Sequence, residues 1–158
     1  VAGEMLELDE QSSIKFRLML FNLGAHRHTV EMLKLPLNRL APLSPGEPDE
    51  PEDPELRDLF QTAYMFLAAF SDHPRNQKEI FRSINTFRLH MGIHELNVAD
   101  TIVASFQNSF ELCSKVPEDV TRSFFILIHK YGRKVRWVRI LLALLVVAGK
   151  PIKKNQDL

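Results

Sequence analysis

DPELRDLFQTAYMFLAAF, residues 53–70, has the most regular apolar spacing in the chain. Apolar residues recur at i, i+3, i+4 and i+7, the spacing that places side chains on one side of an α-helix. They are Leu56, Leu59, Phe60, Ala63, Phe66, Leu67 and Phe70. Asp53 followed by Pro54 supplies a helix cap and a residue suited to the first helical position. The stretch therefore predicts an amphipathic helix that packs its apolar side into a core.

Two helices are predicted upstream of this stretch. The first covers 13–23, with Ser12 or Ser13 as its N-cap and Gly24 as a left-handed stop. The second covers 26–35 and ends at Pro36, since the residue before a proline disfavours helix.

Four further helices are predicted downstream, each bounded by a capping residue, proline or glycine. The first begins at Pro74, capped by Asp72 or His73, and ends at Gly92. The other three are expected from Asn97 to Cys113, from Pro117 to Gly132, and from Lys134 to Ala148, with Gly149 ending the last. In the second of these four, the residues expected to face inward are Val98, Ile102, Val103, Phe106, Phe110 and Cys113.

No segment shows the alternation and turn residues of a β-hairpin. We therefore expect an all-α chain of about seven helices with mostly short connections, as in an armadillo- or HEAT-like α-solenoid. A strict repeat of about forty residues is absent from the sequence. The residues alone therefore leave open whether the helices form a solenoid or a bundle.

The bulk properties fit a single helical domain spanning 1–158, as a fragment of a larger protein. The net charge is zero, but residues 129–158 carry eight Lys or Arg and one Asp. A charge suited to nucleic acid is therefore absent overall, although a local basic surface is present. Cys113 is the only cysteine, so no internal disulfide is expected.

The segment APLSPGEPDEPEDPE, residues 41–55, contains five prolines and six carboxylates. Such a composition cannot bury apolar surface, so residues 37–54 are expected to form a flexible surface loop. A weak calcium site or a site for a basic partner is the alternative for this loop.

The segment GRKVRWVRILLALLVVAGKPIKK, residues 132–154, has nine consecutive apolar residues, Ile140–Ala148. A membrane-spanning helix needs about 20, so we expect no transmembrane segment here. The inward side of the expected helix consists of Val135, Val138, Leu141, Leu142 and Leu145, widened by Val146 and Val147. The basic residues at its two ends are expected to lie about 20 Å apart. They would be solvated, paired with acidic neighbours, or docked to an acidic protein or a phospholipid headgroup.

Residues with catalytic or metal-binding chemistry are few and scattered. His90 and His94 have the spacing of two zinc ligands on a helix, but Gly92 interrupts the helix and no third ligand is nearby. Cys113 lies on an apolar side, where a thiol is usually buried and inert. The sequence therefore predicts no catalytic residue, cofactor or metal; a helical zinc hydrolase around His90 and His94 is a remote alternative.

Three segments resemble one known family. They are LMLFNLGAHRHTVEMLKLP at 18–36, HPRNQKEIFRSINTF at 73–87, and the C-terminal words at 132–157. The last match the pattern G-R-x-V-x-[YW], then G-K-x-[VI]-K-K-x-Q-D, at Gly132, Arg133, Val135, Trp137, Gly149, Lys150, Ile152, Lys153, Lys154, Gln156 and Asp157. The chain resembles the central helical homology domain of inositol trisphosphate receptors and ryanodine receptors, and the C-terminal words favour the former branch. Residues 41–55 depart from the family pattern.

The resemblance implies an armadillo-like α-solenoid in the cytosolic part of a calcium-release channel. It implies a regulatory scaffold, not an enzyme, that links ligand binding to pore opening in a homotetramer on the cytosolic face of the endoplasmic reticulum. Other domains of the same receptor are the expected partners, with regulatory proteins as further ones. The family's ligand-binding head and pore lie outside these residues, so no ligand contact is transferred. The candidate interdomain contacts are Arg133, Arg136, Arg139, Lys150, Lys153 and Lys154.

Two other functions remain open from the sequence. One is a stand-alone armadillo-type scaffold that binds a peptide partner in its groove. The other is the homologous domain of a ryanodine receptor.

Overall fold

The computed structural model describes residues 2–35, 53–91, 93, 96–132 and 135–157. Its helices are α1 (Ala2–Asn22), α2 (Ala25–Leu33), α3 (Pro54–Phe70), α4 (Pro74–Phe81), α5 (Ile84–His90), α6 (Val98–Ala104), α7 (Phe110–Lys115), α8 (Glu118–Tyr131), α9 (Val135–Leu145) and α10 (Lys153–Gln156). One hairpin of two short strands, β1 (Val146–Val147) and β2 (Lys150–Pro151), joins α9 to α10. The all-α prediction is confirmed, apart from this hairpin.

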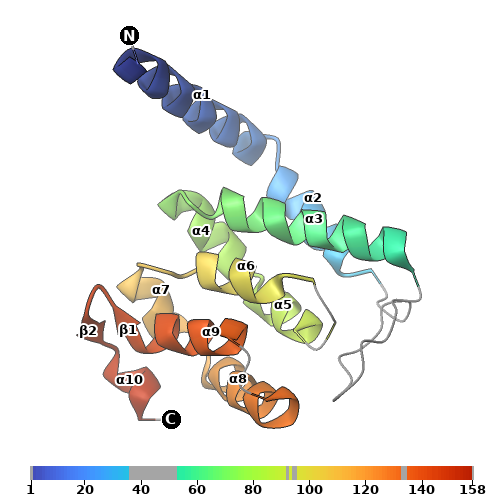
Figure 1. Ribbon diagram of the computed structural model, residues 1–158, viewed down its shortest axis with the longest axis vertical. Coiled ribbons are helices and arrows are strands. Elements are labelled where there is room, and N and C mark those ends of the chain that lie inside the picture. Colours follow the sequence, from blue (N-terminus) through green and yellow to red (C-terminus); the bar gives the residue numbers. More distant parts are fainter. Residues whose placement is uncertain (1, 36–52, 92, 94–95, 133–134, 158) are drawn as a thin grey trace.

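The helices stack in successive layers along the long axis of the molecule (Figure 1). Helices α2 and α3 form one layer, α4 to α6 the next, and α7 to α9 the third; α10 and the hairpin lie to one side of this third layer. Helix α3 packs on α6, and α6 packs on α9. One hydrophobic core runs through all three layers, from Leu33 and Phe60 to Trp137 and Ile140. This order of layers is the arrangement expected of an α-solenoid.

Helix α1 projects from one end of the stack (Figure 1). Gly24, with φ of 70°, takes the left-handed conformation predicted for it and turns the chain into α2. The rings of His26, Phe21 and Phe70 form one stacked cluster, in which the His26 centroid is 5.1 Å from that of Phe21 and 5.2 Å from that of Phe70. Helix α1 begins well before Ser13, so the prediction of an N-cap at Ser12 or Ser13 is wrong.

Helix α3 confirms the prediction for residues 53–70. The Asp53 carboxylate accepts a hydrogen bond from the backbone N–H of Leu56 at 3.0 Å, which caps the helix. Phe60, Leu67 and Phe70 are buried as expected. Leu59 is instead 48% exposed, and the aromatic ring of Tyr64 is buried against the next layer.

Two helices predicted as continuous are each divided in two. The helix expected from Pro74 to Gly92 breaks between Phe81 and Ile84. The helix expected from Asn97 to Cys113 breaks after Ala104, where Asn108 has φ of 61°. Ser109 then caps α7 by accepting a hydrogen bond from the backbone N–H of Leu112 at 3.3 Å. These breaks, with α10, explain why the described residues contain ten helices where the sequence predicts about seven.

The break before α7 changes which side chain faces out. Phe110 is 52% exposed, against the prediction that it faces inward. Cys113 is fully buried, as predicted.

The end of α9 also differs from the prediction. The helix stops at Leu145 instead of Ala148, because Ala148 and Gly149 both have positive φ, 49° and 75°. Two successive residues of this kind form the turn that best fits a two-residue hairpin. The strands are antiparallel, with Val146 opposite Pro151 and Val147 opposite Lys150.

The buried side of α9 is not the predicted one. Trp137, Ile140 and Leu144 are buried. Val135, Val138 and Leu142, predicted to face inward, are 74%, 49% and 64% exposed. The large indole of Trp137 contributes more buried area than a valine, so it decides which side of the helix meets the core.

The predicted flexible loop at 37–54 lies outside the described residues, except for Asp53 and Pro54. Gly92, predicted to end the fourth helix, also lies outside them, and so does His94, one of the two histidines of the remote zinc alternative.

Candidate interaction surface

The basic residues predicted as interdomain contacts lie at the two ends of α9. Arg133 lies outside the described residues. The guanidinium of Arg136 lies 5.0 Å from the centroid of the Trp137 ring, which places a cation over the face of an aromatic ring. Arg139 Nη1 is 3.5 Å from Asp100 Oδ1 on α6. One of the predicted contacts therefore meets an acidic residue of its own chain.

The lysines form a second group at the opposite end of α9. Lys150 lies on β2, and Lys153 and Lys154 lie on α10; all three are exposed. Lys154 Nζ donates to the carbonyl oxygen of Ser114 at 3.0 Å. Arg136 and Arg139 lie within α9 itself, and Arg139 is six positions from the end of the helix at Leu145, which corresponds to about 9 Å. The two basic groups therefore lie on different elements, the arginines on α9 and the lysines on β2 and α10.

Asn155 holds the lysine group against the rest of the domain. Its side-chain amide donates to the carbonyl oxygens of Cys113 at 3.0 Å and Leu144 at 2.8 Å. Asn155 is buried, although its neighbours on α10 are exposed. The α10 lysines therefore have a fixed position relative to α7 and α9.

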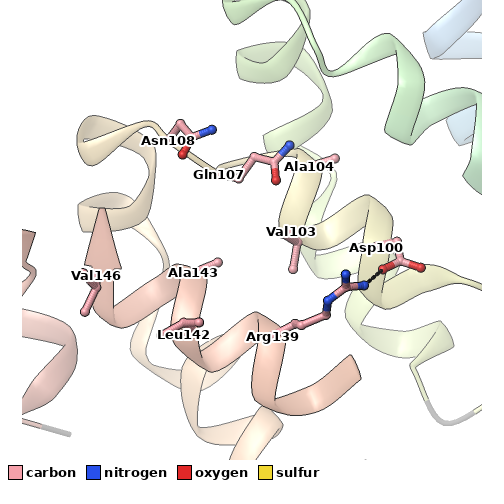
Figure 2. Close-up of a pocket in the computed structure, with 9 residues that line it drawn as sticks. All are labelled: Asp100, Val103, Ala104, Gln107, Asn108, Arg139, Leu142, Ala143 and Val146. Atoms are coloured by element: carbon pink, nitrogen blue, oxygen red, sulfur yellow. Dashed lines mark ion pairs between the residues drawn. The ribbon is translucent and has the colours of Figure 1, made fainter. Parts of the chain in front are cut away.

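A groove of about 470 Å³ runs between α6 and α9, beside the arginine group. Figure 2 shows Arg139 and Asp100 at one end of the groove and Gln107 with Asn108 at the other. Apolar side chains lie between these ends, namely Val103 and Ala104 of α6, Leu142 and Ala143 of α9, and Val146 of β1. The groove is therefore apolar along its length and polar at both ends.

The turn at Gln107 and Asn108 separates this groove from a second one of about 500 Å³, lined partly by Ser71, Gln77 and Lys78. The buried Gln77 amide fixes the turn, because it donates to the carbonyl oxygens of Ala104 and Gln107, both at 2.9 Å. The side chains of Gln107 and Asn108 themselves are exposed. The turn therefore presents two amide side chains from a rigid backbone.

Reasoning from the sequence missed Asp100, Gln107 and Asn108 as members of this surface. The apolar period continues from Phe106 to Phe110, and it hides the turn between them. The sequence did contain one signal of the turn. Asn108 is a residue type that tolerates left-handed backbone, and Ser109 after it is a good N-cap for the next helix.

A comparison with protein families decides the relationship that the three sequence segments suggest. The family model of the RIH domain, named for ryanodine and inositol trisphosphate receptors, matches residues 6–158. This chain belongs to the RIH domain family. The match covers nearly the whole sequence, and it does not separate the inositol trisphosphate receptor branch from the ryanodine receptor branch.

The RIH domain is part of the cytosolic region of calcium-release channels, and it is not an enzyme family. Among the described residues of this RIH domain, no helix is both long and apolar enough to cross a membrane. The described residues also contain no group of three His, Cys, Asp or Glu side chains placed to bind a metal ion.

The titratable side chains in the core of the RIH domain belong to its packing. The Tyr64 hydroxyl forms a hydrogen bond with Nδ1 of His90. Burial lowers the pKa of His90 to about 4, so its imidazole is neutral at physiological pH. Burial raises the pKa of the Cys113 thiol to about 11, and its Sγ lies 3.3 Å from the carbonyl oxygen of Phe106. A thiol with a raised pKa is a poor nucleophile.

Proposed function

We propose that this RIH domain is a regulatory scaffold in the cytosolic part of a tetrameric calcium-release channel that is gated by inositol trisphosphate. The channel lies in the endoplasmic reticulum membrane, and the domain passes movement from the ligand-binding head to the pore. The family match over 6–158 supports the class of channel. The words at 132–157, among them Gly132-Arg133 and Lys153-Lys154, support the inositol trisphosphate receptor branch.

The observation that carries this proposal is the continuous packing of α3 on α6 and of α6 on α9. Protein interiors are close-packed and compress little, so layers that share one core move together. Hydrogen bonds fix the layers further: Thr101 Oγ1 donates to the carbonyl oxygen of Tyr64 at 2.8 Å. A displacement of α2 and α3 is therefore transmitted to α9 and the hairpin instead of being absorbed between them.

The proposed contacts with neighbouring domains of the channel are the basic residues Arg133, Arg136, Arg139, Lys150, Lys153 and Lys154. Lys150 on β2 and Lys153 on α10 are exposed. Charged side chains at such an end fix the orientation of a neighbour more than they increase its affinity.

The test removes residues 13–150 from the channel that carries this chain and replaces them with a flexible linker. Inositol trisphosphate binding and calcium release are then compared in permeabilised cells that lack other such receptors. Binding without release supports transmission through the domain. Retention of both binding and release would refute transmission through the domain. If the intact channel releases calcium only in response to ryanodine receptor agonists, the chain belongs to the ryanodine receptor branch.

A second candidate function is a protein-binding scaffold that acts without a pore of its own. The grooves on either side of Gln107 and Asn108 favour it, because each is large enough to receive side chains of a partner. A transcript in which this chain continues into membrane-spanning segments would exclude this candidate.

A further inference from the structure

We propose that the groove between α6 and α9 is the docking site of an acidic amphipathic helix from a partner protein. The apolar side of that helix lies in the groove, and its carboxylates meet the basic residues at the two ends of α9. This inference rests on the proposed function, since it names the kind of partner that the scaffold receives.

The exposed side of α9 has the geometry of a helix-binding surface. The exposed apolar residues Val135, Val138 and Leu142 of α9 and Val146 of β1 follow one another at intervals of three, four and four positions. Side chains at these intervals form a row nearly parallel to the helix axis, and such a row packs into the side-chain grooves of a second helix. Because Leu142 is 64% exposed, the row has no cover within the described part of the chain.

The groove beside this row permits a close approach. Small side chains, Ala104 from α6 and Ala143 from α9, occupy the positions between the larger walls formed by Val103 and Leu142 (Figure 2). Small residues at a helix contact allow the axes to approach, and they leave room for a large side chain from the partner. The volume of about 470 Å³ is sufficient for several such side chains.

The charges near α9 favour an acidic partner. Several basic side chains elsewhere in the stack pair with carboxylates, for example Arg88 with Asp119 at 3.0 Å and Lys78 with Glu111 at 3.2 Å. In the described part of the chain, Arg136, Lys150 and Lys153 have no carboxylate within ion-pair distance. Carboxylates of a partner helix would complement these charges.

The fourth cation is available by exchange. Arg139 and Asp100 form a pair whose side chains are 68% and 60% exposed. Exposed pairs contribute little to stability, so a partner carboxylate can replace Asp100 beside Arg139 without disturbing the fold. Basic side chains then precede and follow Leu142 along the chain, and a partner helix with carboxylates near both of its ends would complement them.

A protein helix fits these observations better than a lipid surface. The apolar residues line a groove between two helices, and a flat bilayer does not enter such a groove. The Gln107 and Asn108 amides at one end of the groove can also form hydrogen bonds with a polypeptide.

The experiment screens the 158-residue chain against a phage-displayed library of randomised helical peptides long enough to span α9. Enriched peptides are expected to have apolar residues at helical spacing and a net negative charge. Leu142→Asp or, independently, Val138→Glu should lower the affinity of an enriched peptide at least about tenfold. Met65→Asp, on the exposed side of α3, is the matched control and should leave the affinity unchanged.

Charge reversal makes the test specific. Lys150→Glu with Lys153→Glu should weaken binding of the acidic peptide, and replacement of the peptide's carboxylates by lysines should restore it. Three results would overturn the inference: enrichment of basic peptides or of none, binding that neither Leu142→Asp nor Val138→Glu weakens, and competition by vesicles of anionic lipid. Thermal unfolding followed by circular dichroism confirms that each variant is folded.

The two proposals fail separately. If deletion of 13–150 abolishes calcium release but no acidic helix binds the groove, the docking inference is wrong and the scaffold proposal stands. If the acidic helix binds but deletion leaves release intact, the docking site stands and transmission to the pore is wrong.

Discussion

Helices α3 and α9 have the same kind of sequence but different surroundings. Both have apolar residues at helical spacing, and both were predicted to bury that side. Helix α3 lies between α2 and α6, so nearly all of its apolar side is covered. Helix α9 buries Trp137, Ile140 and Leu144 and leaves Val138 and Leu142 exposed. The comparison teaches that α3 stabilises the stack, whereas α9 combines stabilisation with a surface free for a partner.

The largest effect is expected from truncation in α3. Phe60 is fully buried, so Phe60→Ala should lower the free energy of unfolding by about 3–5 kcal/mol, because it removes apolar area and leaves a cavity. Leu59→Ala is the matched control, since Leu59 is 48% exposed, and it should cost less than about 1 kcal/mol. Urea unfolding measures both, and equal losses would contradict the distinction between the two sides of α3.

The second prediction concerns pH and the core between α3 and α5. Burial lowers the pKa of His90 from 6.5 to about 4. The unfolded chain therefore binds more protons than the folded one between these values, and stability falls as the pH drops through this window. The loss assigned to His90 is about 2 kcal/mol between pH 7 and pH 5.

Urea unfolding at the two pH values measures this loss. His90→Gln should remove the part of the pH dependence assigned to His90, and a part from His26, whose pKa burial also lowers, should remain. His28→Gln, at an exposed position of α2, should retain the full dependence. An unchanged pH dependence in His90→Gln would show that other groups are responsible.

The third prediction concerns the attachment of α10 to α9. Asn155→Ala removes two hydrogen bonds, at 3.0 and 2.8 Å, and leaves the carbonyl oxygens of Cys113 and Leu144 without this donor. The free energy of unfolding should fall by about 1–3 kcal/mol. Gln156→Ala is the neighbouring control, and its exposed side chain should contribute less than about 0.5 kcal/mol. Proteolysis near the hairpin should increase only in the Asn155 variant.

The smallest effect on stability is expected at the exposed end of α9. Arg139→Glu disrupts a pair that is more than half exposed, so the free energy of unfolding should change by less than about 1 kcal/mol. Combined with Arg136→Glu in the intact channel, it should nevertheless alter calcium release. A large loss of stability would make these arginines structural, and unaltered release would exclude them as contacts.

The prediction from sequence was most successful where local signals agreed with one another. The cap at Asp53, the proline at position 54 and the apolar spacing all indicated α3, and the structure confirms them. The start of α8 after Pro117 and its end at Gly132 were predicted for the same reason. The failures lie where the apolar period runs through a break, as between Phe106 and Phe110. When two helices on either side of a turn have apolar residues that continue the same helical spacing, the spacing does not reveal the turn.

The candidate surface was only half predictable. The basic residues are visible as a cluster in the sequence, since eight of them fall within 129–158. The opposing residue Asp100 is far from Arg139 along the chain, and the two approach only because α6 packs on α9. No local pattern carries that contact.

The sequence by itself determined the all-α class, the limits of the best-capped helices, the membership in the RIH family and the basic C-terminal region. These properties depend on residues that are near one another in the chain, such as Asp53 and Leu56, or on family motifs. Tertiary structure alone decided which side of α9 faces outward and where the groove lies. The reason is physical: the choice between two apolar sides of one helix depends on the area that distant partners can cover, and Trp137 gains more from burial against α6 than Val138 does.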